Sequence, residues 1–160
     1  MGNLKIVSWA AAVLLLLTTA GPGSGQGLPK PGPKDKCPVC GMFVAKYPDW
    51  TASVRFAGGE QAFFDGVKDM LKFTFNMGRY APGKTPADVA AVQVTDYYAL
   101  EAIDGRTAFY VVGSDVFGPM GKELIPFAQR AQAEEFLKDH KGRAIYTWSE
   151  LAPDLIKTLE

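Results

Sequence analysis

A succession of strand, turn, strand, helix and strand occurs twice along this chain, and it limits the fold more than any other feature. In the first copy, polar and apolar residues alternate on both sides of the turn Gly58–Gly59, which is typical of a β-hairpin. Asp65 then stands at the position of a helix N-cap, and Gly78 is placed to end that helix. The elements predicted for this copy are a strand at 51–57, a strand at 61–64, a helix between Asp65 and Gly78, and a strand at 90–95.

The second copy is predicted to begin with another hairpin, in which strands at 97–102 and 107–112 flank the turn Ile103–Arg106. Residues 113–121 are rich in glycine and are expected to form a loop. The elements predicted after that loop are a strand at 123–127, a helix at 129–140 with Gly142 as its stop, a strand at 143–148 and a short helix at 153–159. The sequence therefore predicts an α+β fold, with two similar hairpin–helix–strand (ββαβ) modules at 37–96 and 97–160 forming one compact body.

Residues 1–26 have the order of a secretory signal, with Lys5 first, an apolar run from Ile6 to Ala20 and then small residues. Because this run is shorter than the ~20 apolar residues needed to cross a bilayer, a cleaved signal is favoured over an uncleaved membrane anchor. Residues 27–36 contain spaced prolines and are predicted to be a semi-stiff tether. We therefore expect an exported, periplasmic protein.

The charge balance gives no indication of a nucleic-acid partner. The whole chain has 17 basic and 17 acidic residues, and Lys5 is the single charged residue of the leader, so the rest carries 16 against 17. A net charge this close to zero gives no support for nucleic acid or an acidic membrane surface as the partner.

The two cysteines of the chain lie in one short motif, Cys37-Pro38-Val39-Cys40-Gly41-Met42. A disulfide across so small a loop would add little stability, so the fold itself does not explain them. Their spacing lets both thiolates turn toward one ion, and Met42 offers a third sulfur. Thiolate and thioether are soft ligands that favour Cu(I). Zinc seldom uses methionine, and no motif supplies the four donors of a closed zinc site.

Two other interpretations of the cysteine pair remain open. Thiol–disulfide redox proteins have two cysteines at the same spacing. Their redox sites, however, usually lie between a buried strand and a helix rather than after a proline-rich tether. Alternatively, the cysteines only brace a turn in a structural interaction module.

Met120 is a second candidate sulfur ligand, because glycine and proline surround it on a predicted loop. Met70 and Met77 fall on the predicted helix and are expected to be core residues. His140, the single histidine, lies at a predicted helix end, and its role as a ligand stays open. With one histidine, no phosphate-binding loop and no paired-carboxylate motif, the sequence does not predict an enzyme.

Three sequence blocks resemble the NosL family, the exported copper-binding accessory proteins of nitrous-oxide reductase. The blocks are residues 37–50, residues 64–70 and residues 119–127. The resemblance implies two ββαβ modules, Cu(I) held by cysteine and methionine sulfur, and delivery to the copper centre of nitrous-oxide reductase or a related cuproenzyme with the help of an ABC transporter. We accordingly expect Cys40 and Met42, together with Cys37 and Met120, to bind one Cu(I).

Overall fold

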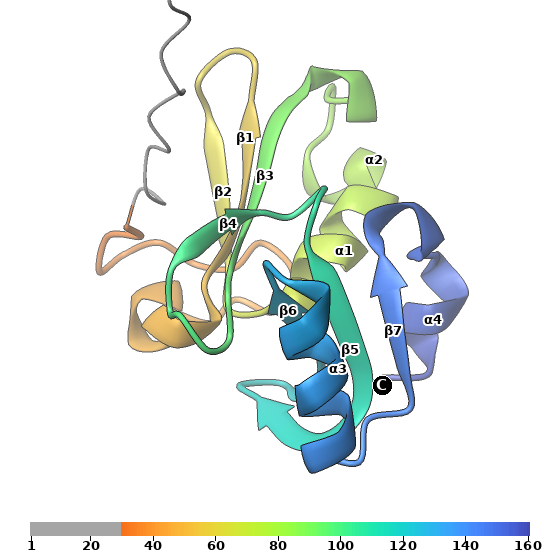
Figure 1. Ribbon diagram of the computed structural model, residues 1–160. Coiled ribbons are helices and arrows are strands. Elements are labelled where there is room, and N and C mark those ends of the chain that lie inside the picture. The colour runs from red at the N-terminus through yellow and green to blue at the C-terminus, as the bar shows by residue number, and fades with distance from the viewer. Residues whose placement is uncertain (1–29) are drawn as a thin grey trace, which may run out of the picture.

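Two antiparallel sheets, one formed by strands within residues 52–104 and the other by strands within residues 109–147, form the framework of the molecule (Figure 1). The computed structural model describes residues 30–160, so the predicted signal at 1–26 and the first residues of the predicted tether lie outside the described residues. The strands are β1 (Ala52–Phe56), β2 (Gln61–Phe64), β3 (Val89–Thr95), β4 (Ala102–Asp104), β5 (Phe109–Gly118), β6 (Gly121–Phe127) and β7 (Ala144–Thr147). The α-helices are α1 (Val67–Phe75), α2 (Met77–Tyr80), α3 (Arg130–Asp139) and α4 (Pro153–Lys157).

The same topology occurs in both sheets. The first has the strand order β2-β1-β3-β4 and the second the order β6-β5-β7. In each, the central strand pairs antiparallel with its hairpin partner and with the strand that returns after the helix. The prediction of an α+β fold made of two ββαβ units is confirmed.

The hairpin of β1 and β2 forms as the sequence predicts. Ala52 lies opposite Phe64, and Gly59 in the connecting turn has a φ of +89°, a conformation that favours glycine. The apolar residues of β1 point into the core while Arg55 is exposed.

The predicted second hairpin at 97–112 is wrong. β4 pairs with β3 of the first sheet, Val94 lying opposite Ile103, and β5 pairs with β6 and β7. The reason is a turn at Asp96, whose carboxylate accepts the backbone N–H groups of Tyr98 and Ala99, both at 2.9 Å. This Asx turn reverses the chain directly after β3.

The predicted loop at 113–121 is mostly strand. β5 continues to Gly118 through an irregularity between Val112 and Phe117, and β6 begins at Gly121. The turn between them contains Pro119 and Met120. Because a bulged strand can carry glycines and still pair, the glycine content of this stretch did not mark a loop.

Asp65 does not cap α1, and Gly78 does not end it. The N-cap residue is Gly66, and the helix stops at Phe75, after which Gly78 belongs to α2. The capping carboxylate comes instead from Glu123 on β6, whose Oε1 accepts the Lys68 N–H at 2.6 Å. A side chain at Gly66 would collide with this carboxylate, so the close approach requires glycine there.

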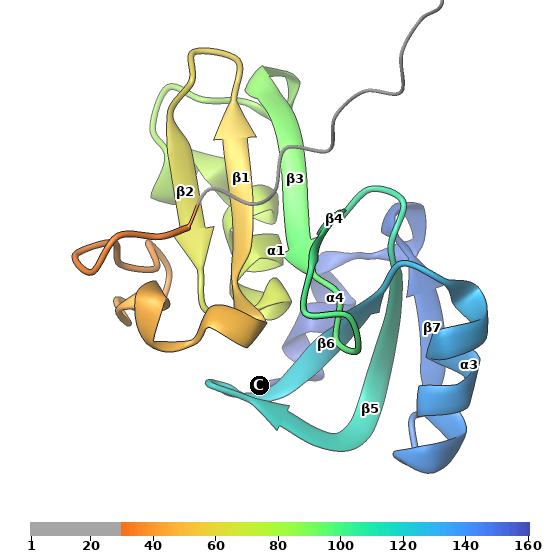
Figure 2. The same cartoon turned by 60° about the vertical axis from the view of Figure 1, so that its left-hand side comes forward.

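One hydrophobic core is shared by both modules. It contains residues of β1, β3 and α1 together with Tyr110 and Val112 of β5 and Leu124 of β6. A smaller cluster lies between α3 and the second sheet, around Phe127 and Phe136. Figure 2 shows α3 against the second sheet on the side away from the first module. Among residues 30–160 no helix is both long and apolar enough to cross a membrane.

Candidate metal centre

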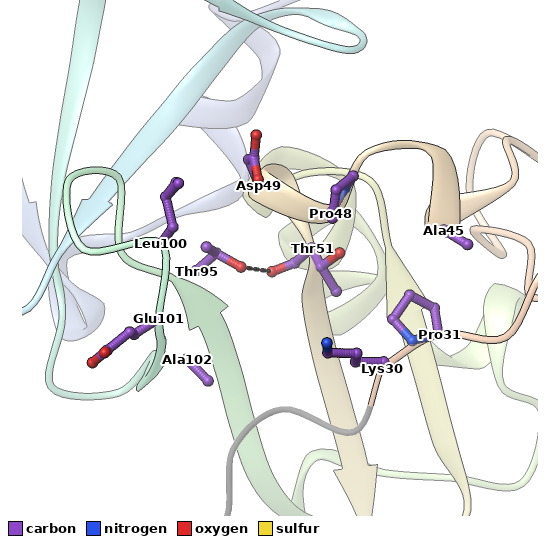
Figure 3. Close-up of a pocket in the computed structure, with 10 residues that line it drawn as sticks. All are labelled: Lys30, Pro31, Ala45, Pro48, Asp49, Thr51, Thr95, Leu100, Glu101 and Ala102. Atoms are coloured by element: carbon purple, nitrogen blue, oxygen red, sulfur yellow. Dashed lines mark hydrogen bonds between the residues drawn. The ribbon is translucent and has the colours of Figure 1, made fainter.

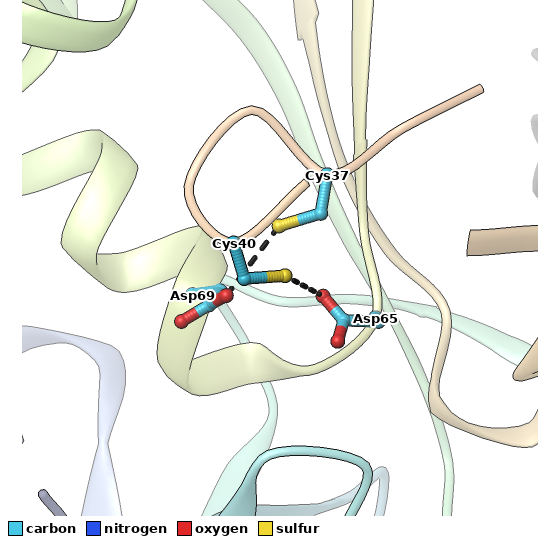
Figure 4. Close-up of side chains that lie close together, drawn as sticks. All are labelled: Cys37, Cys40, Asp65 and Asp69. Carbon is cyan, nitrogen blue, oxygen red and sulfur yellow. Dashed lines mark hydrogen bonds between the residues drawn. The ribbon is translucent and has the colours of Figure 1, made fainter. Parts of the chain in front are cut away.

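The cysteine motif forms a tight closed loop ahead of the first sheet. Cys37 N–H donates to Met42 O at 2.9 Å, and Gly41 N–H donates to Cys37 O at 2.8 Å. Gly41 has a φ of +80°, which this turn requires and which glycine adopts without strain. The loop directs both sulfur atoms toward the start of α1 (Figure 4).

Two carboxylates meet the two thiols. The Cys37 thiol donates to Asp69 Oδ2 at 3.4 Å, and the Cys40 thiol donates to Asp65 Oδ1 at 3.1 Å. One ligand atom from each of the four residues lies within 4.8 Å of the other three. We call Cys37, Cys40, Asp65 and Asp69 the sulfur–carboxylate cluster.

The two aspartates are the residues that sequence reasoning missed. The sequence pattern predicts a helix cap at Asp65 and indicates no role for Asp69. The available signal was the presence of two carboxylates four residues apart, one shortly before α1 and one in its first turn. Both also fall in residues 64–70, one of the three blocks that resemble the NosL family.

Burial keeps both thiols protonated in the metal-free chain. Cys37 is 1% exposed, and burial raises the pKa of its thiol to about 11. Burial also raises the pKa of the Cys40 thiol, and its hydrogen bond to Asp65 acts in the same direction. A redox-active cysteine needs a lowered pKa so that the thiolate is available at neutral pH, so the environment disfavours the thiol–disulfide interpretation.

The cluster fits a bound cation by the chemistry of its donors. Asp65 is 1% exposed, and its Oδ2 has no hydrogen-bond partner among the described residues. A buried carboxylate oxygen without a partner is costly, and a cation would satisfy it. Two thiolates and two carboxylates also complete a four-donor set, so the argument against zinc from missing donors no longer holds.

The structure places the two methionines differently. Met42 ends the cysteine loop and is half-buried. Met120 lies at the tip of the β5–β6 hairpin and is 45% exposed. A cavity of about 340 Å³ is lined by both Met120 and Asp69, so the hairpin tip of the second module borders the cluster of the first. Ligation by Cys37, Cys40, Met42 and Met120 stays a prediction.

His140 does not belong to the sulfur–carboxylate cluster. It follows α3, its ring stacks on Phe136 with centroids 4.3 Å apart, and its Nδ1 lies 3.1 Å from Asp115 Oδ1. These contacts explain the residue without a metal.

A second cavity, of about 640 Å³, lies between the N-terminal segment and the turn after β3 (Figure 3). The hydrogen bond from Thr95 Oγ1 to Thr51 O, 2.8 Å long, lies within it. Its lining includes Lys30, Asp49 and Glu101 but neither a cysteine nor a methionine. The two cysteines and Met120 therefore do not border this cavity.

The fold and the site together define a small α+β binding protein in which two cysteines converge on two carboxylates. The family model described as NosL matches residues 30–156, and the chain belongs to this family. A curated relative, the copper-binding lipoprotein NosL of Stutzerimonas stutzeri, is 27% identical over 119 residues, which are 69% of this chain and 59% of the relative's length.

The crystal structure of the copper chaperone NosL from Shewanella denitrificans shares the fold. Its TM-score is 0.65 at 22% sequence identity, and the match covers 78% of this chain and 94% of that chain. The names of the two relatives describe copper-binding proteins, one of them a lipoprotein, and neither name describes an enzyme.

Proposed function

We propose that this chain is a copper chaperone that binds Cu(I) at the loop 37–42 and passes it to a copper enzyme outside the cytoplasm. The observation that carries the proposal is the convergence of the Cys37 and Cys40 sulfurs with Asp65 and Asp69 within 4.8 Å. The names of the relatives support copper rather than another soft metal.

In this proposal the sulfur atoms hold the ion. The Asp65 and Asp69 carboxylates position the thiols in the metal-free chain and lie beside the bound cation once the thiols have lost their protons. Cys40 and Met42, with Cys37 and Met120, form a soft and partly open site from which the ligands of a partner displace the ion stepwise. Each thiol releases its proton on binding, so affinity falls in acid, whereas thioethers do not titrate. The carboxylates also give the cluster the donors for a harder four-coordinate ion such as zinc, so metal analysis should measure both metals.

The partner expected from the family resemblance is nitrous-oxide reductase or a related cuproenzyme, with an ABC transporter assisting delivery. A partly open Cu(I) site suits such a transfer, because an incoming ligand can bind before the first ligand leaves. Anaerobic mixing of the Cu(I)-loaded chain with the metal-free client enzyme, followed by metal analysis of each, tests the transfer.

The binding test is an anaerobic competition against a Cu(I) chelator. We expect one Cu(I) per chain, with affinity lowered about tenfold or more by Cys40→Ser and measurably by Met120→Ala. His140→Ala is the control and should bind like the unmodified chain, because His140 contacts Asp115 and Phe136 rather than the cluster. Unchanged competition in both ligand variants contradicts the proposed site.

A further inference from the structure

We propose that Lys68 is a positioning residue that holds the Met120 turn of the second module against the sulfur–carboxylate cluster of the first. The inference rests on the proposed function in one respect, the naming of Met120 as a ligand. It adds a residue that binds no metal and yet brings the two halves of the site together.

The side chain of Lys68 crosses from α1 to the second module. Its Nζ donates to Met120 O at 2.8 Å, to Lys122 O at 2.8 Å and to Leu159 O at 3.5 Å. An ammonium has three N–H donors, and three carbonyl oxygens lie within reach of them here. Two of these carbonyls lie on either side of Gly121, so one lysine fixes the backbone of the turn that carries Met120.

The backbone of Lys68 is joined to the same strand. Glu123 on β6 is buried, and its Oε1 accepts both Lys68 N–H at 2.6 Å and Leu124 N–H at 2.9 Å. Both the backbone N–H and the side-chain ammonium of Lys68 are therefore hydrogen-bonded to β6. Its neighbour along α1 is Asp69, which contacts Cys37 and lines the Met120 cavity.

Stability alone is a poor reason for this lysine. Lys68 is 3% exposed, and burying an ammonium is costly even when its donors are satisfied. Apolar side chains that replace a buried charged group together with its partners often cause little loss of stability. What the ammonium supplies is direction, because its hydrogen bonds fix one position of the turn relative to α1.

The turn needs such a restraint because a bulge separates its own strand pairs, Phe117 with Lys122 and Gly118 with Gly121, from the regular part of the β5–β6 pairing. The pairing of β5 with β6 is irregular between Val112 and Phe117, and Phe117 and Met120 are both exposed. The hairpin approaches the first module at Gly118, where an added Cβ would lie 3.3 Å from the Trp50 ring. Loss of the Lys68 hydrogen bonds would leave the tip free to pivot about this contact.

The first test is independent of copper. Methionine methyl groups labelled with ¹³C report the position and mobility of each methionine in the metal-free chain. Lys68→Met keeps most of the length of the side chain and removes its donors, and the one additional methyl signal it introduces belongs to position 68. We expect the Met120 methyl to shift and its order parameter to fall, while the methyl of Met70, which is fully buried, is unchanged.

The second test is a double-mutant cycle in Cu(I) affinity. Lys68→Met should weaken binding about tenfold, and it should have no further effect once Met120→Ala is present, since a positioning residue acts through the residue it positions. The matched control is Lys141→Met, a lysine whose side chain is 84% exposed and remote from the cluster, and it should change neither measurement.

The outcomes separate this inference from the proposed function. If the unmodified chain binds no Cu(I), the proposed function fails, and the Met120 methyl still decides whether Lys68 positions the turn. If Lys68→Met leaves the Met120 methyl unchanged, or weakens Cu(I) binding equally with and without Met120, the inference is overturned. Should Lys68→Met not fold, Lys68→Arg is measured in the same way, since a guanidinium keeps the charge but not the shape of the ammonium.

Discussion

The carboxylate of Asp65 lies directly ahead of α1, where Oδ1 accepts the Cys40 thiol and Oδ2 has no partner among the described residues. In the metal-free chain this arrangement opposes folding, because a buried carboxylate loses its hydration and regains only one hydrogen bond. A bound cation removes that cost. Asp65 therefore lowers the stability of the metal-free protein and favours binding of a cation.

Asp65→Asn should separate these two effects. The amide has the same shape without the charge, so we expect the metal-free variant to be more stable by about 1 to 3 kcal/mol in urea denaturation. Its affinity for metal should fall at the same time. A variant that is no more stable when empty, or that binds metal as well as the unmodified chain, contradicts the role given to the Asp65 carboxylate.

At the scale of single elements, α1 is the one whose start depends on a distant part of the chain. Its first turn is capped by Glu123 of β6 rather than by a neighbouring residue. Burial raises the pKa of Glu123 to about 7, although its two backbone donors and Lys68 act in the opposite direction. The folded chain therefore holds the proton of Glu123 more tightly than the unfolded chain does.

This shift predicts a pH dependence of stability. Between about pH 4.5, the ordinary pKa of a glutamate, and about pH 7, the folded state binds more protons than the unfolded state, so the contribution of Glu123 to stability falls as pH rises. The loss amounts to roughly 3 kcal/mol over this interval. Denaturation of the metal-free chain across the interval measures it, and Glu123→Gln should flatten the profile. An equal slope in both proteins contradicts the shift.

The sequence predicted those elements whose signals are local. The β1–β2 hairpin needs only alternation around Gly58–Gly59, and α3 needs only its apolar face, with Ala133 and Phe136 both buried. The pairing of β4 depends on the side chain of Asp96, which turns the chain where a run of apolar residues indicated a strand. Such a turn competes with strand formation through hydrogen bonds that periodicity does not register.

Only the part of the candidate site that lies in one short stretch of sequence could be predicted. Cys37, Cys40 and Met42 lie in one motif, so their proximity follows from the sequence. Asp65 and Asp69 reach them across 25 and 32 residues, through packing of the loop on α1. Glu123 caps α1, so Asp65 does not have the capping role that its position before the helix predicts. No local pattern in the sequence indicates that the cap comes from Glu123.

At the scale of the whole molecule, the two modules are not separate folding units. The larger core combines residues such as Val54 and Met70 of the first module with Leu124 and Tyr110 of the second. Either module alone would expose its part of this surface to water. The sharing of one core explains why a site can be built from both modules without a flexible joint between them.

Unfolding should therefore occur in one transition. We expect far-UV circular dichroism and tryptophan fluorescence to give coincident curves in denaturant. Leu124→Ala, at a fully buried position of the shared core, should lower the free energy of unfolding by about 2 to 5 kcal/mol and shift both curves together. Two resolved transitions, or a shift seen by one probe alone, contradict a single cooperative unit.

The distance of Glu123 from Lys68 along the chain also sets an order of events during synthesis. The two residues are 55 positions apart, and Leu159, whose carbonyl Lys68 also reaches, is 91 positions away. A ribosome releases the cysteines and both aspartates long before either of these partners, and the long connection must close before the start of α1 gains its cap. The residues of the sulfur–carboxylate cluster are therefore synthesised early, but the cluster is completed late. An ion that reaches the incomplete chain meets the two thiols before Asp65 and Asp69 are held beside them.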